Sequence, residues 1–286
     1  NGDPSAIARM SDIEVRLAAE EAAPMSDEEK KYYQAALEAL PEPERAHFAE
    51  DKEGVMLIVR GFANEKDRMA ATTDAIKMIS EWRERTGFYG DFDRPMQGAE
   101  DFHKWWPERI HGTDKLGHVV QSLRIEELDP EKIASLSDEH IDRFQGQRLK
   151  AYTHYKQEKA KQSGVQRYKH TLIIDLKGVG MGMLAGQKRH TVKKIFHVGS
   201  TYFPETMWRI YLVNPPMVFR AVWSVVKNFL HPITVNKIQF CGGNKDACKK
   251  MQDESIPLEA IPEWMGGGNK GVAAFDYIQH LTAAKN

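Results

Sequence analysis

Three polar side chains flank the most apolar stretch of the sequence: Glu205 lies before it, and Thr234 and Lys237 lie after it. If that stretch leaves a β-sheet and returns to it, both of its ends lie at one sheet edge, and the three side chains can meet. A lysine beside a hydroxyl suits a phosphate group, and a nearby carboxylate can orient the lysine or accept hydrogen bonds from a polyol. We therefore predict a phosphate-binding cluster, with a purely structural Glu205–Lys237 ion pair as the alternative.

The apolar stretch itself combines a strand and a helix. Arg209 to Val213 is typical of a buried strand, and Pro215 and Pro216 end it because proline lacks the N–H that a sheet ladder needs. Residues 217–230 then predict a helix whose polar side chains form one narrow stripe. This helix is about 21 Å long, too short to span a bilayer. It is either a core helix of an α/β protein or a helix with an apolar ligand on one face and lipid on the other.

A glycine-rich segment, Gly178-x-Gly180-x-Gly182, follows a predicted strand, as in dinucleotide-binding motifs. That fingerprint needs a small residue where Met183 stands and an acidic residue about 20 positions later. Residues 186–204 contain no Asp or Glu. We interpret the segment as a flexible turn between a strand and a helix. The sequence also lacks the common hydrolase, P-loop and zinc-protease motifs, so we expect neither an enzyme nor a metal site.

Two further features concern basic side chains. A basic run on a predicted helix consists of Lys188, Arg189, His190, Lys193 and Lys194. It is either a solvated helix face or a surface for anionic lipids, where each nearby basic residue contributes about 1 kcal/mol. His170 lies within a predicted buried strand, where a hydrogen-bonded core histidine is favoured over a ligand contact.

Composition excludes several protein classes. Charged residues make up 28% of the 286 residues, but the formal net charge is −1, which leaves no global footprint for nucleic acid. No apolar run approaches the ~18 residues of a membrane-spanning helix. We interpret Cys241 and Cys248 as reduced thiols of a cytoplasmic protein, because two cysteines do not make a disulfide framework. The first residues do not read as a secretory signal, and whether the chain is part of a longer protein stays open.

The order of the predicted elements indicates an α/β protein with three regions. Residues 1–25 are a poorly ordered lead or a loosely held helix. Residues 26–95 predict a helical subdomain with helices at 26–40, 51–62 and 66–85. Residues 96–286 predict the main domain, in which strands and helices alternate, and this alternation favours a mostly parallel sheet. Its strands are expected at 118–124, 170–176, 209–213 and 234–240, and a long helix at 137–162.

Several separate motifs, in their order and spacing, resemble the CRAL-TRIO lipid-binding domain, and most of all the phosphatidylinositol/phosphatidylcholine transfer proteins. The likeness extends over roughly residues 50–275. In the main domain its motifs are Asp175-Leu-Lys-Gly, Tyr202-x-Pro-Glu, Tyr211-x-x-Asn-x-Pro, the Phe-rich helix, Pro232-x-Thr-x-x-Lys-Ile and Ile261-Pro-Glu-Trp-Met-Gly-Gly. In the helical subdomain they are Leu57-Ile-Val-Arg and Glu81-Trp-Arg.

The resemblance implies a sheet floor with helices around a large hydrophobic pocket, and a mobile gate helix at 217–231. It implies that Glu205, Thr234 and Lys237 hold the phosphate of an inositol headgroup. A basic residue of the N-terminal helices is expected to join them, and Arg60 is the candidate. The remaining ligand-binding residues that we expect are His170, Leu172, Phe219, Val222, Trp223 and Val226.

The chain also departs from the family pattern. The family holds a choline headgroup with two tyrosines, a serine and a threonine, whereas the corresponding residues here are Ile110, Gln121, His170 and Leu172. Trp208 stands where the family often has a glycine that acts as the gate hinge. The resemblance thus implies a retained phosphatidylinositol site, a lost phosphatidylcholine site with some different second lipid, and a lid that opens differently or less.

We therefore expect a protein that holds one phospholipid, most of all phosphatidylinositol, under a gate helix and exchanges it with membranes without chemistry. We expect no cofactor besides the lipid, no nucleic acid partner, and a cytoplasmic monomer that touches membrane surfaces transiently. A lipid kinase or a trafficking protein is a further candidate partner. The alternatives are a non-transferring lipid sensor or scaffold, a carrier of a sterol, a tocopherol-like molecule or haem, and, most remote, an enzyme that uses the glycine-rich turn.

Overall fold

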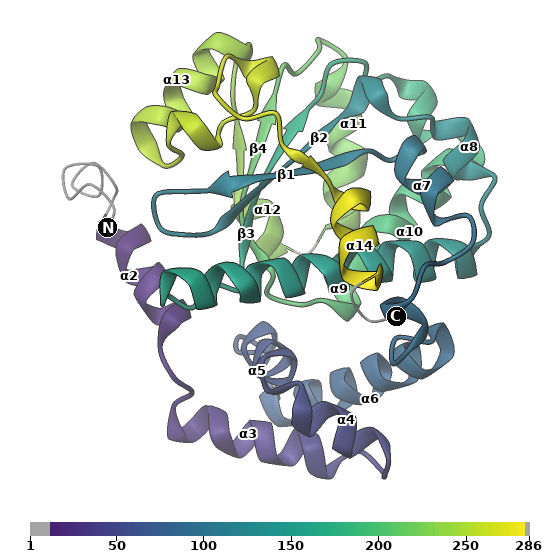
Figure 1. The fold of residues 1–286 in the computed structure, drawn as a ribbon, viewed down its shortest axis with the longest axis vertical. Coiled ribbons are helices and arrows are strands. Elements are labelled where there is room, and N and C mark those ends of the chain that lie inside the picture. Colours follow the sequence, from purple (N-terminus) through teal and green to yellow (C-terminus); the bar gives the residue numbers. More distant parts are fainter. Residues whose placement is uncertain (1–11, 231, 284–286) are drawn as a thin grey trace.

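The computed structural model describes residues 12–230 and 232–283, which form a small helical part and a larger α/β part (Figure 1). The helical part lies at one end of the molecule, and the long helix α9 (Asp138–Ser163) runs between it and the sheet. Its helices are α3 (Asp27–Glu38), α4 (Glu44–Glu50), α5 (Lys52–Gly61) and α6 (Arg68–Thr86). The three helices predicted for this region are confirmed, and α4 was not predicted.

Local sequence signals start and end these helices. The Ser26 hydroxyl accepts a hydrogen bond from the Glu29 N–H, and the Glu29 carboxylate accepts one from the Ser26 N–H, which closes a capping box at the start of α3. Helix α6 ends at Gly87, whose φ of 75° is the left-handed conformation that glycine adopts without strain. Phe48 and Ile76 are fully buried between the helices, so this part has a core of its own.

Helix α2 (Asp12–Ala22) lies in the region 1–25, which was predicted to be a poorly ordered lead or a loosely held helix. It lies beside the α/β part (Figure 1), and Arg60 of α5 donates a hydrogen bond to the carbonyl of Glu21 in its last turn. Glu14 forms an ion pair with Arg209, and the buried carboxylate of Glu21 contacts His118. Residues 1–11 of the predicted lead lie outside the described residues.

The α/β part is built on a sheet of six strands in the order β5-β4-β3-β2-β1-β6. The pairs β2–β3, β3–β4 and β4–β5 are parallel, whereas β1 is antiparallel to both of its neighbours. The mostly parallel α/β sheet is therefore confirmed, and the strands β1 and β6 were not predicted. The strands are β1 (Glu108–Thr113), β2 (Val119–Arg124), β3 (His170–Asp175), β4 (Met207–Val213), β5 (Ile238–Phe240) and β6 (Val272–Ala273).

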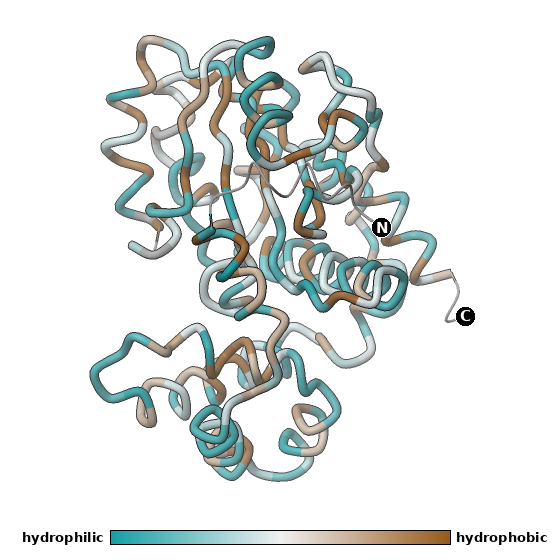
Figure 2. Tube along the Cα trace, turned by 90° about the vertical axis from the view of Figure 1, so that its left-hand side faces the viewer, coloured by the Kyte–Doolittle hydropathy of each residue, from teal (hydrophilic) through white to brown (hydrophobic). Residues whose placement is uncertain are grey.

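The two faces of the sheet have different neighbours. On one face, Val120, Ile173 and Tyr211 join a core cluster under α13 (Asn244–Glu254) and the segment that follows it. On the other face, Gln121, Leu172, Ile210 and Ile238 are cross-strand neighbours in a single row. Because side chains alternate along a strand, the two sets point to opposite sides. Figure 2 shows how the hydrophobic residues gather along the strands and the helices that cover them.

The second face is covered by α9, α10 (Gly186–Tyr202) and α11 (Phe219–Val226). In the described part of the chain, no helix is at once long enough and apolar enough to cross a bilayer. The remaining helices are α7 (Ala99–Trp105), α8 (Pro130–Ala134), α12 (Pro232–Asn236) and α14 (Ala274–Ala283). Short 3₁₀ turns occur at η1 (Asp91–Asp93), η2 (Ile125–Glu127), η3 (Met181–Leu184), η4 (Lys227–Phe229), η5 (Leu258–Ala260) and η6 (Glu263–Met265).

Two predicted elements differ from the structure. The helix predicted for 217–230 is α11 followed by the 3₁₀ turn η4. The Ser224 hydroxyl donates to the Ala221 carbonyl and the Asn228 amide donates to the Ser224 carbonyl, so side chains compete there for carbonyls that a continuing helix would use. The strand predicted for 234–240 begins only at Ile238, because Pro232 is the first residue of α12, where its missing N–H costs nothing.

Candidate functional site

An apolar cavity of about 330 Å³ lies between the second face of the sheet and the helices that cover it. Leu172, Ile210 and Ile238 from the strands form its floor, and side chains of α9, α10 and α11 form its walls. The volume falls within the range of small-molecule and cofactor sites. The polar side chains of the lining form two main groups. One contains Glu205 and Lys237, and the other contains Glu108 and Arg148.

The structure brings nine of the ten predicted site residues to this cavity. Glu205, Thr234 and Lys237 all line it, although Thr234 lies on α12 and not on a strand. The others that line it are His170, Leu172, Phe219, Val222, Trp223 and Val226. Arg60 is the exception, and it does not appear in the cavity wall.

Helix α11 closes one side of the cavity with the apolar face that the sequence predicted. Phe219 and Val222 are buried, and they pack against Ile210 and Leu212 of the sheet. The rings of Phe219 and Trp223 stack with centroids 6.1 Å apart. The opposite face is open to solvent, and the side chain of Met217, just before the helix, is fully exposed. The helix therefore has an apolar surface toward the cavity, while Arg220 and Ser224 are exposed on its outer side and the exposed Met217 and Val218 lie just before its start.

Glu205 lies between two ammonium groups. Its carboxylate is 2.8 Å from Nζ of Lys169 and 3.8 Å from Nζ of Lys237. The contact with Lys237 is too long for a hydrogen bond, so Lys169 is the close partner. The ammonium of Lys237 is thus only weakly paired with Glu205, which suits an anionic ligand. Glu205 also has a φ of 57°, a left-handed conformation that is rare for a residue of its size and that often occurs at functional sites.

The two lysines titrate differently. Burial lowers the pKa of Lys237 and the Lys169 charge lowers it further, and together these effects outweigh the attraction of Glu205. For Lys169, burial also lowers the pKa, but the closer Glu205 carboxylate reverses the effect and leaves it raised. The approach of an anion to Lys237 would relieve the cost of its buried charge.

Lys169 is a site residue that the sequence-based prediction missed. It precedes β3 directly and its ammonium is less than one-fifth exposed. A signal was present, since Lys169 is adjacent in sequence to His170, the predicted cavity residue at the start of the central strand. Residues at the ends of neighbouring parallel strands meet at one sheet edge, and the start of β3 lies next to the loop that carries Glu205.

Arg60 is held away from the cavity by other contacts. Its guanidinium donates to the Glu29 carboxylate at 2.8 Å and to the Tyr168 hydroxyl at 2.6 Å. It also donates to the backbone carbonyls of Glu21 and Ala23. The structure thus assigns Arg60 to a junction between the N-terminal helices and the segment before β3, because all of its donating groups are directed there.

His170 lies in the cavity wall and is buried. Burial, reinforced by the charges of Lys156, His118 and Lys237, lowers its pKa well below the usual value, so the imidazole is neutral. Its Nδ1 has no hydrogen-bond partner among the described residues. Of the other positions that replace the choline-binding residues, Gln121 and Leu172 line the cavity, whereas Ile110 is buried in a different core cluster.

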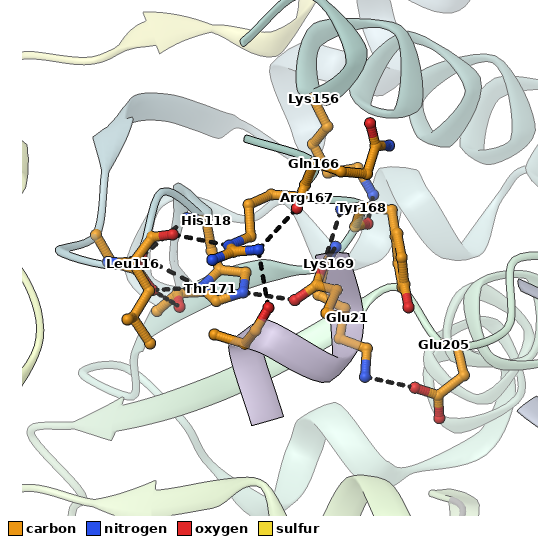
Figure 3. A network of polar contacts seen from close by, with 12 residues as sticks. Glu21, Leu116, His118, Lys156, Gln166, Arg167, Tyr168, Lys169, Thr171 and Glu205 are labelled. Atoms are coloured by element: carbon orange, nitrogen blue, oxygen red, sulfur yellow. Dashed lines mark hydrogen bonds and ion pairs between the residues drawn. The ribbon is translucent and has the colours of Figure 1, made fainter. Parts of the chain in front are cut away.

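Trp208 does not act as a substitute for a hinge glycine, because it lies within β4 rather than in the segment that joins β4 to the lid. Its indole stacks on the imidazole of His118, with ring centroids 4.1 Å apart and an interplanar angle of 17°. His118 in turn is bound by Glu21 of α2 in the network that Figure 3 shows. Trp208 thus contributes to the packing of α2 on the sheet.

The glycine-rich turn and the basic run have structural contacts. A Cβ at Gly178 would lie 3.2 Å from Cα of Glu126, so this glycine is required by close backbone packing. In the basic run, Lys188 pairs with Glu131, His190 with Asp138 and Lys194 with Asp142, and these pairs tie α10 to α8 and α9. Among the described residues, no group of three or more His, Cys, Asp or Glu side chains could hold a metal ion.

Comparisons with known proteins agree with this geometry. Phosphatidylinositol/phosphatidylcholine transfer protein SFH7 of Arabidopsis thaliana is 29% identical over 179 residues, which is 61% of this chain and 32% of that protein. The SEC14 cytosolic factor of Eremothecium gossypii is 27% identical over 217 residues, 71% of this chain and 67% of that protein. The chain spans about a third of the length of the Arabidopsis relatives SFH7, SFH4 and SFH12.

Among solved structures, the crystal structure of Sfh5 aligns at a TM-score of 0.47 and 15% identity, over 66% of this chain and 68% of that one, a likeness too remote to carry an argument. The family model described as the CRAL/TRIO domain matches residues 105–267, which include β1 to β5 and the helices α9, α10 and α11. Because this match covers more than half of the chain, the chain belongs to the CRAL/TRIO domain family.

Proposed function

We propose that the chain binds a single phospholipid, most of all phosphatidylinositol, in the cavity under α11 and exchanges it with membranes. The observation that carries this proposal is an apolar cavity whose wall includes Glu205 and Lys237, with Lys169 as the close ion-pair partner of Glu205. Acyl chains require the apolar surface, and the headgroup phosphate requires the positive charge. The named activities of the relatives, phosphatidylinositol and phosphatidylcholine transfer, support the same class of ligand.

The energetics suit exchange rather than permanent storage. Burial of an acyl chain contributes roughly 0.8 kcal/mol per CH₂ group relative to water. The same chains are already out of water in a bilayer, so moving them into the cavity is close to neutral. Specificity must therefore come from the headgroup, where Lys237 is the uncommitted donor because it lies 3.8 Å from Glu205.

A phosphate that approaches Lys237 would meet a buried ammonium that lacks a close anion. Charge-assisted hydrogen bonds of this kind contribute about 1.5–3 kcal/mol. Thr234, which also lines the cavity, would donate a second bond through its hydroxyl, and Glu205 would accept from hydroxyls of an inositol ring. No bond is made or broken in this process, so we propose a carrier and not an enzyme.

We further propose that the protein works from the cytoplasm and contacts membranes transiently through the lid. The exposed Met217 and the apolar side chains of α11 would exchange ligand contacts for lipid contacts there. A lipid kinase or a trafficking protein remains a candidate partner that would receive the lipid from this chain.

Transfer of labelled phosphatidylinositol between donor and acceptor vesicles tests the proposal. We expect the purified chain to accelerate transfer in proportion to its concentration. A non-transferring sensor would bind the lipid without accelerating its transfer. A chain that neither binds nor transfers phospholipid would contradict the proposal.

A further inference from the structure

The second polar group in the cavity wall lies toward strands β1 and β2, away from Glu205. It is built by side chains of β1, β2 and α9: Glu108, Gln121, Gln145, Arg148 and Tyr152. Arg148 is only 1% exposed and Gln121 only 2%. Burying a guanidinium costs several kcal/mol unless other groups satisfy it, so the partners of Arg148 determine what this group of residues can do.

The acceptors within this group are already occupied. The Glu108 carboxylate accepts from Nε1 of Trp106 at 2.7 Å and from the Tyr152 hydroxyl at 2.6 Å. It also pairs with Nη2 of Arg148 at 3.1 Å. The remaining contact of Nη2 is with Oε1 of Gln145. Glu108 therefore has three donors, and its acceptor capacity is largely used.

In the described part of the chain, the buried atoms of this group that lack a hydrogen-bond partner are all donors. Among the described residues, Nε and Nη1 of Arg148 and Nε2 of Gln121 are buried without a hydrogen-bond partner. The guanidinium also lies over the rings of Phe102 and Trp106, which cannot accept hydrogen bonds in its plane. Unsatisfied buried donors are rare in folded proteins and point to a missing acceptor.

We propose that these donors bind an oxyanion carried by an amphiphilic ligand, so that the cavity has a second headgroup subsite around Arg148 and Gln121. The inference rests on the proposed function in one respect, namely that the cavity takes an amphiphile. A positively charged choline group does not fit this subsite, because Arg148 would repel it and Tyr152 is committed to Glu108. The required chemistry is a carboxylate or a phosphate on an acyl chain, which a fatty acid or phosphatidate would supply.

Two variants test the subsite. Arg148→Met removes the guanidinium, and Gln121→Leu removes one donor but leaves the Arg148–Glu108 pair intact. Gln121→Leu therefore still tests the subsite if Arg148→Met fails to fold. Gln252→Leu, at an exposed position of α13, is the matched control. Equilibrium binding is measured for oleate, oleyl alcohol, phosphatidate and phosphatidylcholine, with binding of phosphatidylinositol measured in parallel.

We expect the wild-type chain to prefer oleate over oleyl alcohol or phosphatidate over phosphatidylcholine, and the preferred anion identifies its source. Each variant should weaken binding of that anion roughly 10- to 100-fold, while the control does not. The subsite would be overturned if the wild-type chain bound oleate no better than oleyl alcohol and phosphatidate no better than phosphatidylcholine. It would also be overturned if the variants bound these anions as the wild type does. Failure of the proposed function is distinguishable, because it appears as absent phosphatidylinositol binding whatever the oleate and phosphatidate results.

Discussion

The carboxylate of Glu205 lies 2.8 Å from the ammonium of Lys169 but 3.8 Å from that of Lys237. One lysine is therefore committed to Glu205, while the other is held nearby with its charge only partly balanced. From these two distances we propose that Lys169 supports the fold of the site and that Lys237 is available to a ligand. The predictions below follow from this division and from the packing around it.

Replacement of Lys237 by Ala should reduce phosphatidylinositol transfer roughly 10- to 100-fold, because one charge-assisted contact to the phosphate is lost. The free energy of unfolding should change little, since the contact with Glu205 is long and the variant removes a mostly buried charge whose burial is itself unfavourable. Vesicle transfer and urea denaturation measure the two quantities. Lys249→Ala, on the exposed face of α13, is the matched control, and equal transfer by the two variants would refute the headgroup role of Lys237.

Replacement of Lys169 by Ala should lower both transfer and stability. Its removal leaves the Glu205 carboxylate, which is only 16% exposed, without its close cation. Losing one partner of a buried pair is destabilising because the other charge stays uncompensated. Urea denaturation of this variant should therefore show a larger loss than Lys237→Ala, and a smaller loss would show that Lys169 is not the committed partner.

Amide hydrogen exchange across 219–226 should become faster when phospholipid vesicles are added, because the lid leaves the sheet to let lipid pass. Helix α6 packs in the core of the helical part and serves as the internal reference, with unchanged exchange. Identical protection of α11 with and without vesicles would mean that this helix is not the gate.

The stability of the protein should depend on the protonation of His118. Its ring nitrogens contact Asp114 at 3.0 Å and Glu21 at 2.7 Å. Burial lowers the pKa of His118, but the two carboxylates outweigh it and leave the pKa raised above the usual 6.5. The stabilisation is therefore fully present below about pH 6.5 and is lost as the pH rises through the folded-state pKa.

Urea denaturation at a series of pH values, for wild type and His118→Gln, checks this dependence. The difference in unfolding free energy between the two should be largest near pH 6 and should shrink as the solution becomes alkaline. His280→Gln, at an exposed position of α14, should reproduce the wild-type profile. A constant difference between wild type and His118→Gln at every pH would show that the histidine is bound in its neutral form.

Trp208→Gly distinguishes a packing role from a hinge role. Since the indole stacks on His118, its loss should lower the free energy of unfolding by about 1–3 kcal/mol. Protection of the lid against hydrogen exchange should stay as in wild type. Trp208→Phe keeps an aromatic ring there and should recover part of the stability. Faster exchange in α11 of the glycine variant, with stability unchanged, would restore the hinge interpretation.

Much of the sheet could be predicted because local patterns determine it. The apolar run of β3 indicates a strand covered on both faces, and the alternation of neighbours such as Gln121 and Val120 places them on opposite sides. The apolar face of α11 was likewise predictable from its sequence. Patterns of this kind predict which residues share a face, and so they identified part of the cavity wall.

Contacts between distant segments were not predictable in the same way. Arg60 was assigned to the phosphate site, but Glu29 and Tyr168 bind its guanidinium, and nothing in the local sequence indicates those partners. The docking of α2 depends on Glu21, which accepts hydrogen bonds from the backbone N–H groups of Tyr168 and Lys169 (Figure 3). Both sets of contacts join residues that are far apart in the sequence.

The secondary-structure prediction for the segment around Thr234 was wrong for another reason. Pro232 was taken to end one helix, whereas it also begins the next, because proline is tolerated in the first turn. The error changed the element that carries Thr234. It did not change the place of Thr234 in the cavity wall, which also contains Lys237, the residue directly before β5. Side-chain chemistry and sequence order were thus sufficient to place these residues at the site.

Mass spectrometry of the lipid extracted from the purified chain tests the central claim most directly. We predict one phospholipid per chain, enriched in phosphatidylinositol, and a marked loss of phosphatidylinositol from the Lys237→Ala variant but not from Lys249→Ala. Recovery of the chain without phospholipid, or with phosphatidylinositol equally abundant in both variants, would contradict the account of a lipid cavity whose headgroup site is Lys169–Glu205–Lys237.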